Sequence, residues 1–216
     1  MTILNPTGGV FGGDRLTMEV DVGTGAAACV TTPSATRVYR SDGRVAEQTV
    51  RLTLAAGASL EWVPDHTIPF AGSEFRQSIA ADVAEGATLI LVDAWSAGRI
   101  ARDEAWRFAR IDSAITVRDT AGLVLYDRFV LPTSLASDSL GLAEGCPYFA
   151  TVAVVANERV GQFTEALAGL AIPGATLGAA RLPRRGLLVR CLAASAPSLT
   201  DALEAVWNLA RREVLE

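Results

Sequence analysis

The residues of this sequence that could do chemistry are mostly acidic. The chain contains one histidine, His66, and three cysteines, Cys29, Cys146 and Cys191. One imidazole and widely separated thiols cannot build a closed nitrogen and sulfur site for zinc or nickel within one chain. What remains is weak ligation by carboxylate oxygens, aided by His66, which suits a metal in passage and not a tightly bound cofactor. The candidate carboxylates are Asp14, Glu61, Asp65, Asp93 and Glu104.

Catalytic arrangements find little support in the sequence. No G-x-S-x-G elbow presents a serine, and His66 between Asp65 and Thr67 is more typical of a loop hydrogen-bonder than of a base. Asp103 and Glu104 are adjacent, so in an extended segment they point to opposite faces and cannot act as one carboxylate pair. We therefore predict that the chain is not an enzyme. The alternative left open is a cytosolic β-solenoid enzyme that uses paired carboxylates on a sugar or small acid.

The glycine pairs near the start do not indicate a phosphate-binding loop. Gly8-Gly9 and Gly12-Gly13-Asp14 lack a following Gly-Lys-Ser/Thr, and an alternating strand pattern follows them where a helix would be needed. Paired glycines supply positive φ or close backbone approach at a tight turn. We interpret this segment as such a turn, with Asp14 as its side-chain acceptor.

Composition excludes several classes of protein. The 216 residues carry a net charge of −5, half of them are hydrophobic and 20% are charged. An acidic chain has no basic face for nucleic acid, and this apolar content predicts a folded core. No apolar stretch is long enough for a membrane span. The scattered cysteines and the absence of a signal-like start predict a cytoplasmic protein.

The elements that must position these residues repeat with a period near 30. Alternating apolar runs begin at residues 16, 50, 79 and 111, and each ends in a small-residue turn that leads into another apolar run. The turns are Gly25-Ala26, Gly57-Ala58, Gly86-Ala87 and, more loosely, Ala121-Gly122. Stacked layers are typical of such a period, because one unit cannot bury its own face. The sequence thus predicts a mainly β, solenoid-like body over residues 1–145, whose loops hold most of the polar residues.

The last third has a different pattern. Residues 150–156 resemble a buried strand, and 160–170 carry apolar residues at helical spacing. Residues 175–182 and 187–193 flank a turn at 183–186, and Ser198 with Asp201 resembles a capping box that opens a final helix. We expect residues 146–216 to form a strand-helix-strand-strand-helix portion packed on the β body as one structural unit.

Four ordered blocks resemble the urease accessory protein D family (UreD, called UreH in some bacteria). Residues 5–14, Asn-Pro-Thr-Gly-Gly-Val-Phe-Gly-Gly-Asp, are similar to its glycine-rich signature. Residues 31–41, residues 60–70 and the set Gly98, Arg99, Glu104 and Phe108 are similar to its next three blocks. The C-terminal third fits by layout more than by motif. Family members usually carry a further N-terminal segment, so we expect this chain to lack a first layer and to expose a β edge.

The resemblance implies a non-catalytic scaffold in urease maturation. Members of the family bind apo-urease and, with the accessory proteins UreF and UreG, a GTPase, form the complex that delivers nickel to the buried dinuclear site. The family is thought to offer an internal, water-filled path for the ion. No cofactor is then held tightly, and Ni²⁺ is in transit. Whether the chain is dimeric within the accessory complex is left open. A passive structural module of some other assembly is a further alternative.

The resemblance also implies roles for residues inside the matching blocks. We expect the nickel path to be lined by Asp14 and Glu104, with Glu61, Asp65 and His66 as weaker candidates. A second set would brace the path or contact a partner, because arginine grips carboxylates with a fixed fork geometry. This set comprises Arg37, Tyr39, Arg40 and Ser41.

Overall fold

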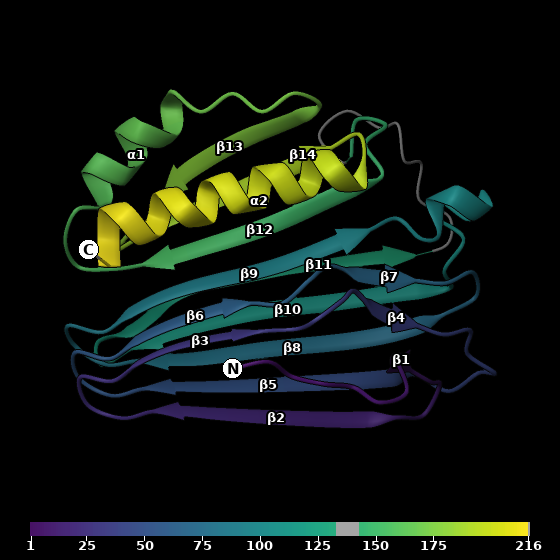
Figure 1. Ribbon diagram of the computed structural model, residues 1–216. Coiled ribbons are helices and arrows are strands. Elements are labelled where there is room, and N and C mark those ends of the chain that lie inside the picture. Colours follow the sequence, from purple (N-terminus) through teal and green to yellow (C-terminus); the bar gives the residue numbers. More distant parts are fainter. Residues whose placement is uncertain (133–142, 216) are drawn as a thin grey trace.

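The computed structural model describes residues 1–132 and 143–215 of the chain. Two β-sheets lie face to face, and two helices cover the outer face of the larger sheet, as Figure 1 shows. The predicted class, a mainly β, solenoid-like body followed by strand-helix-strand-strand-helix, is confirmed.

The smaller sheet contains the first strand of every solenoid layer. Its order is β11-β10-β8-β5-β2, and the neighbours from β2 to β10 are parallel. Residues that pair across neighbouring strands are separated in sequence by roughly the period of 30. Arg15 lies opposite Glu47, Ala46 opposite Phe75, and Glu74 opposite Arg110. Its strands are β2 (Arg15–Val22), β5 (Ala46–Leu54), β8 (Glu74–Val83), β10 (Arg110–Asp119) and β11 (Gly122–Pro132).

The larger sheet receives the second run of each layer and then continues into the C-terminal portion. β6 and β7 pair with β9 in parallel, and β3 and β4 pair in parallel with β6 and β7. On the other side of β9, β12, β14 and β13 extend the sheet in antiparallel order. Its strands are β1 (Gly9–Val10), β3 (Ala27–Thr31), β4 (Thr36–Val38), β6 (Ser59–Val63), β7 (Thr67–Pro69), β9 (Thr88–Ser96), β12 (Tyr148–Val155), β13 (Ala175–Arg181) and β14 (Leu187–Ala193).

The predicted turns connect the two sheets. Gly25, Gly57 and Gly86 adopt φ values of +67°, +67° and +71°, the left-handed region that favours glycine. The fourth turn differs from its predecessors. At Gly122, φ is +123°, and the chain reverses into β11, which pairs antiparallel with β10 in the same sheet. This hairpin ends the repeat, because its tight turn leaves no chain to cross to the other sheet.

The space between the sheets is filled by the alternating apolar side chains that the sequence pattern predicts. Their largest cluster includes Leu52, Leu60, Ile79, Leu89 and Val117, all at most 2% exposed. A second cluster lies on the other face of β9, β12 and β14, where these strands meet the helices.

The two helices are α1 (Val160–Ala168) and α2 (Ala196–Ala210), and a π-helical turn, η2 (Arg211–Leu215), extends the second. The N-cap of α2 is Ser195, whose hydroxyl accepts the Ser198 amide at 3.2 Å, so the predicted start at Ser198 is wrong. Pro197 lies inside the first turn because that turn leaves amide groups unpaired in any case, and a missing N–H costs nothing there. In the described ranges no helix is long and apolar enough to cross a membrane.

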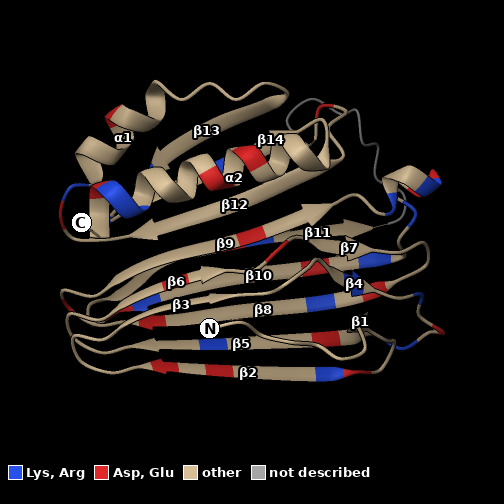
Figure 2. Ribbon diagram, in the orientation of Figure 1, with Lys and Arg blue, Asp and Glu red and all other residues tan. Residues whose placement is uncertain are grey.

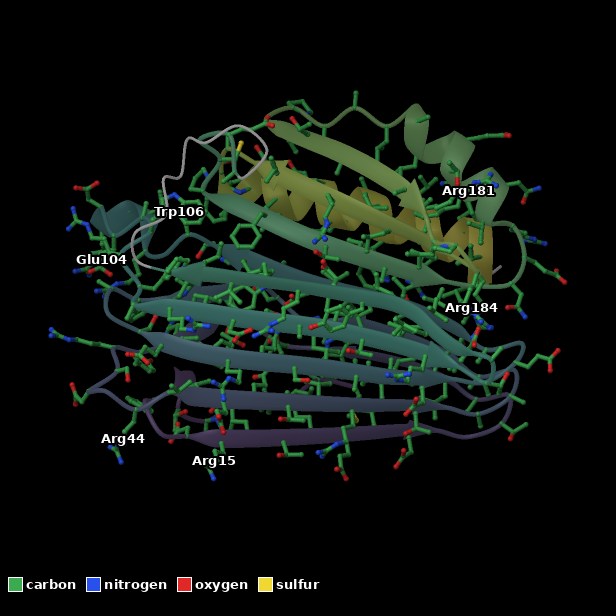
Figure 3. The ribbon with its side chains drawn as sticks, turned by 180° about the vertical axis from the view of Figure 1, so that it is seen from behind. Arg15, Arg44, Glu104, Trp106, Arg181 and Arg184 are labelled. Carbon is green, nitrogen blue, oxygen red and sulfur yellow. The ribbon has the colours of Figure 1, made fainter. Side chains whose placement is uncertain are left out.

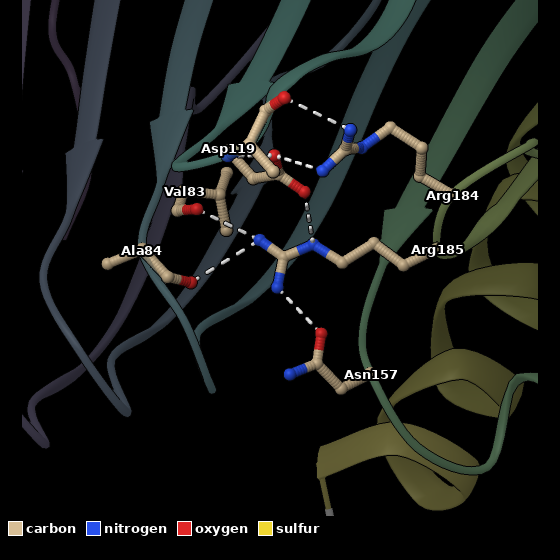
Figure 4. A network of polar contacts seen from close by, with 7 residues as sticks. Val83, Ala84, Asp119, Asn157, Arg184 and Arg185 are labelled. Carbon is tan, nitrogen blue, oxygen red and sulfur yellow. Dashed lines mark hydrogen bonds and ion pairs between the residues drawn. The ribbon is translucent and has the colours of Figure 1, made fainter.

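An arginine pair in the turn between β13 and β14 joins the C-terminal portion to the solenoid (Figure 4). The Arg185 guanidinium donates to the carbonyls of Val83 and Ala84 and to Asn157 Oδ1 at 2.7 to 3.3 Å. Arg184 donates to Asp119 Oδ1 at 2.9 Å. Burial raises the pKa of Asp119, but bonds from the Ala121 amide and Arg184 outweigh it, and the net pKa is lowered.

Replacing Arg185 with methionine should weaken this junction, because it leaves two carbonyls near the turn without their donor. We expect the free energy of unfolding to fall by about 1 to 3 kcal/mol, the cost of leaving a buried acceptor without its hydrogen bond. The matched control is Arg118→Met, since Arg118 is exposed and has no ion pair in the described parts of the chain. Urea unfolding measures both; equal losses would contradict a specific junction.

Candidate functional site

The four sequence blocks meet at one end of the solenoid, the end where η1 (Ile100–Arg102) lies in Figure 1. One side chain from each layer contributes to a ladder there. Phe11 stacks on Tyr39 with ring centroids 4.5 Å apart, and Tyr39 meets the edge of Phe70 at 5.2 Å. The Arg99 guanidinium lies 4.1 Å from the centre of the Phe70 ring. The ladder joins the layers at this end.

Glycines in these blocks allow the close packing of the ladder. A Cβ on Gly9 would lie closer than 3.0 Å to the Arg37 carbonyl and to the Tyr39 ring. A Cβ on Gly12 would clash with the Arg44 carbonyl, also under 3.0 Å. The sequence interpretation of these glycines as close-approach positions is therefore confirmed, and they form no phosphate-binding loop, because β2 and no helix follows them.

The predicted path residues at this end are held by local contacts. Asp14 Oδ2 accepts the Phe11 amide at 2.9 Å, which is the expected turn acceptor. Glu104 forms a bidentate ion pair with Arg99 at 2.5 and 2.8 Å. The hydrogen bonds from Arg99 lower the pKa of Glu104 more than burial raises it. Figure 3 shows the Glu104 side chain on the outside of this end.

The predicted bracing residues differ in exposure. Tyr39 is half-buried in the ladder, and Ser41 donates its hydroxyl to the Arg44 carbonyl. Arg37 and Arg40 are exposed and make no ion pair with any described residue. They are free to bind an anionic group.

Glu61, Asp65 and His66 lie on the helix side of the larger sheet or in the loop beside it. Glu61 is buried and accepts Trp207 Nε1 at 2.5 Å, while Arg211 lies 3.1 Å from the same oxygen. His66 Nδ1 bonds Asp65 Oδ1 at 2.8 Å, which confirms His66 as a loop hydrogen-bonder. This bond lowers the pKa of Asp65 despite partial burial. Of the five predicted path residues, only Asp65 and His66 contact each other directly. The described residues contain no group of three or more His, Cys, Asp or Glu side chains that could hold a metal ion.

A row of buried and half-buried polar side chains crosses the space between the sheets. Gln48, Gln77 and Ser113 occupy one register position on β5, β8 and β10. Gln48 donates to Gln77 at 3.1 Å, and Gln77 donates to Asp93 of β9 at 2.8 Å. Ser113 donates to the other Asp93 oxygen at 3.3 Å. Gln77 and Ser113 thus both donate to the Asp93 carboxylate, whose pKa is raised by burial.

The row continues on the larger sheet beyond Asp93. Thr151 lies opposite Asp93 in the register of β9 and β12, and Arg190 lies opposite Thr151 on β14. Arg190 donates to the Thr151 hydroxyl and to Asp127 Oδ1, the latter at 2.6 Å. Polar groups therefore extend from the core to the surface formed by β11 and β14.

Cavities lie at both ends of this row. The first, of about 130 Å³, reaches from Asn5 past Asp65 to Gln77 and Asp93. The second, of about 440 Å³, is lined by Asp127, Thr151 and Arg190, among others. The first is large enough to hold several waters. The buried Trp62 Nε1 beside it has no hydrogen-bond partner among the described atoms, which favours water in the cavity.

This arrangement suits weak and reversible binding of a cation. One carboxylate and a few neutral oxygens provide hard ligands but no closed set, and a raised pKa makes the site compete with protons for the ion. The sequence reasoning named Asp93 among possible ligands but missed Gln48, Gln77 and Ser113. These three residues could have been found in the sequence, because each is a polar residue at an inward position of an otherwise apolar strand and the pattern repeats in successive layers.

Comparison with known proteins identifies the fold family. The sequence model of the family described as UreD urease accessory protein matches residues 1–216. The chain belongs to the UreD family. It is 33% identical to urease accessory protein UreD of Opitutus terrae over 209 residues, covering 94% of this chain and 76% of that protein. It is 34% identical to UreD of Deinococcus radiodurans, with 98% and 76% covered, and 37% identical to UreD of Anaeromyxobacter, with 85% and 63% covered.

Membership in the UreD family supports two of the sequence predictions. The resemblance seen in the four blocks is confirmed over the whole chain. The family consists of urease accessory proteins and not of catalysts, which supports the prediction that the chain is not an enzyme.

Proposed function

We propose that this chain, like the UreD proteins it resembles, acts in urease maturation as a scaffold that binds apo-urease, UreF and UreG in the cytoplasm and passes Ni²⁺ along the polar row through Asp93. The main support for the nickel role is that the buried Asp93 carboxylate lines the first cavity, and its register neighbour Thr151 lines the second. A conduit needs an ion to enter easily and leave easily, and few ligands of moderate strength meet that need.

The structure changes which residues we assign to the path. Asp93 becomes the central candidate, with Asp65 where the first cavity nears the surface. Asp14, Glu61 and Glu104 make turn, helix and ion-pair contacts, so we assign them to architecture. Arg37 and Arg40 remain candidates for partner contact, since both are exposed cations without an ion pair in the described ranges.

Complementation tests the proposal. This chain is expressed in cells that lack their own UreD but contain a cognate urease with UreF and UreG, and purified urease is analysed for nickel. We expect nickel content and urease activity to return, and tagged chain to retain UreF. Soluble chain that retains UreF without restoring nickel would contradict the conduit role alone. Chain that is soluble but retains no accessory protein would contradict the scaffold role as well.

A further inference from the structure

Gln77 lies at the centre of the polar row, and its amide group is held from both ends. The Nε2 nitrogen donates to Asp93 Oδ1 at 2.8 Å and to Ser113 Oγ at 3.1 Å. The Oε1 oxygen accepts from Gln48 Nε2 at 3.1 Å. Gln77 is only 4% exposed, so these protein groups and not bulk solvent set the direction of its amide.

This direction of the amide opposes a cation at Asp93. Asp93 is the one charged residue of β9, the red segment of that strand in Figure 2, and it forms no ion pair with the part of the chain that the structure describes. The N–H hydrogen of Gln77 and the hydroxyl hydrogen of Ser113 carry positive partial charge and point at its carboxylate. These hydrogens occupy the side from which an ion would bind, so the row in this state stabilises the bare carboxylate.

Rotation of two amides reverses this polarity. A half-turn of a glutamine amide exchanges its donor and its acceptor with almost no change of shape. Gln48 lies opposite Gln77 in the register of β5 and β8, is half-buried and lines the first cavity, so its amide has room to turn. After both half-turns Gln77 Nε2 donates to Gln48 Oε1, and Gln77 Oε1 faces Asp93.

The distances of the row fit oxygen ligands of one small divalent cation. Oxygens about 2.1 Å from such an ion lie about 3 Å apart at adjacent corners of an octahedron. The Gln77 amide position that faces Asp93 lies 2.8 Å from Asp93 Oδ1 and 3.1 Å from Ser113 Oγ, and Ser113 Oγ lies 3.3 Å from Asp93 Oδ2. With an oxygen at that amide position, the three side chains have the spacing of a shared set of ligands.

We propose that Gln77 is a switch that admits a divalent cation to Asp93, with Gln48 as its coupled partner. In the closed state Gln77 presents its N–H to Asp93, and in the open state it presents Oε1. The second Gln77 hydrogen is then satisfied by water in the first cavity, which Gln77 also lines. The switch rests on the proposed nickel role of Asp93 and adds a residue that controls when the ion is bound.

Nuclear magnetic resonance of the full chain tests the direction of the amide, with Zn²⁺ as a diamagnetic divalent probe. Without metal, we expect nuclear Overhauser effects between the Gln77 amide protons and the β protons of Ser113. Saturating Zn²⁺ should abolish them and strengthen those to the Gln48 side chain. Gln77 protons that stay beside Ser113, while Asp93→Asn weakens Zn²⁺ binding, would overturn the switch alone. Zn²⁺ binding that is unaffected by Asp93→Asn would contradict the metal path itself, and the switch with it.

Substitutions of Gln48 test the coupling. Glutamate accepts only and favours the open state, whereas lysine donates only and favours the closed state. We expect Gln48→Lys to bind Ni²⁺ at least about tenfold more weakly than Gln48→Glu in calorimetry, an effect typical of groups that orient metal ligands. Thr49→Glu and Thr49→Lys are the matched controls, because Thr49 is the next residue of β5 and points to the other face. An equal difference between the two control variants would show an effect of charge alone and would overturn the coupling.

Discussion

Replacing Asp93 with asparagine is expected to lower the nickel content of urease about tenfold in complemented cells, an effect of the size that follows loss of a group in a metal's surroundings. Asparagine keeps the shape of the side chain and can still accept from Gln77, so the polar row stays intact. Only the negative charge is lost. Nickel in purified urease, measured by atomic emission, reports the result.

A matched control and a second readout make this prediction specific. Asp82→Asn removes a carboxylate from an exposed position of β8, and we expect it to leave nickel content unchanged. Retention of UreF by Asp93→Asn must equal that of the unaltered chain. Normal nickel content with Asp93→Asn would exclude the carboxylate as a step of the path, whereas loss of UreF would assign Asp93 to assembly.

The same substitution should make the chain more stable at neutral pH. Burial raises the folded pKa of Asp93 above the unfolded value of 3.8, so folding favours the protonated acid. The unaltered chain therefore loses stability as pH rises from the unfolded pKa toward the folded pKa. Asparagine cannot ionise, so its advantage should be absent near pH 3 and grow with pH. Urea unfolding at several pH values measures this difference.

Replacing Gly98 with alanine is expected to give the largest loss of stability, about 3 kcal/mol or more, because a strained φ and a backbone clash add together. Its φ is +136°, and a Cβ there would lie closer than 3.0 Å to the Glu104 carbonyl. The backbone segments at Gly98 and Glu104 cannot move apart easily. Arg99 forms an ion pair with Glu104 and lies over the Phe70 ring, which holds this turn against the ladder. Urea unfolding and soluble yield measure the loss.

Gly43→Ala is the control for this variant. Gly43 also has a positive φ, +80°, but a Cβ there would have nothing within 4 Å. It should cost about 1 kcal/mol through backbone conformation alone. The excess of Gly98→Ala over Gly43→Ala then measures the clash. Equal costs would show that the turn at Gly98 can move away from Glu104.

Local sequence patterns were sufficient for the solenoid and for the family. Turns at Gly25, Gly57 and Gly86 require positive φ, and the apolar alternation between them has period 2, so both signals can be recognised without knowing any distant contact. The exception was the last turn, at Gly122, where the sequence pattern resembled a further layer but the chain formed a hairpin. The start of α2 was also misplaced, because Ser195 and Ser198 both resemble caps.

The polar row was decided only by the tertiary structure. Gln48, Gln77 and Ser113 belong to three layers, and only the strand register places them beside one another and against Asp93. Glu61 and Glu104 look like ligands in sequence, but Trp207 and Arg99 bind them in the fold. Composition and period determine which residues point inward. Which inward polar residues meet depends on how separate layers align, and that alignment is set by contacts between residues far apart in the chain.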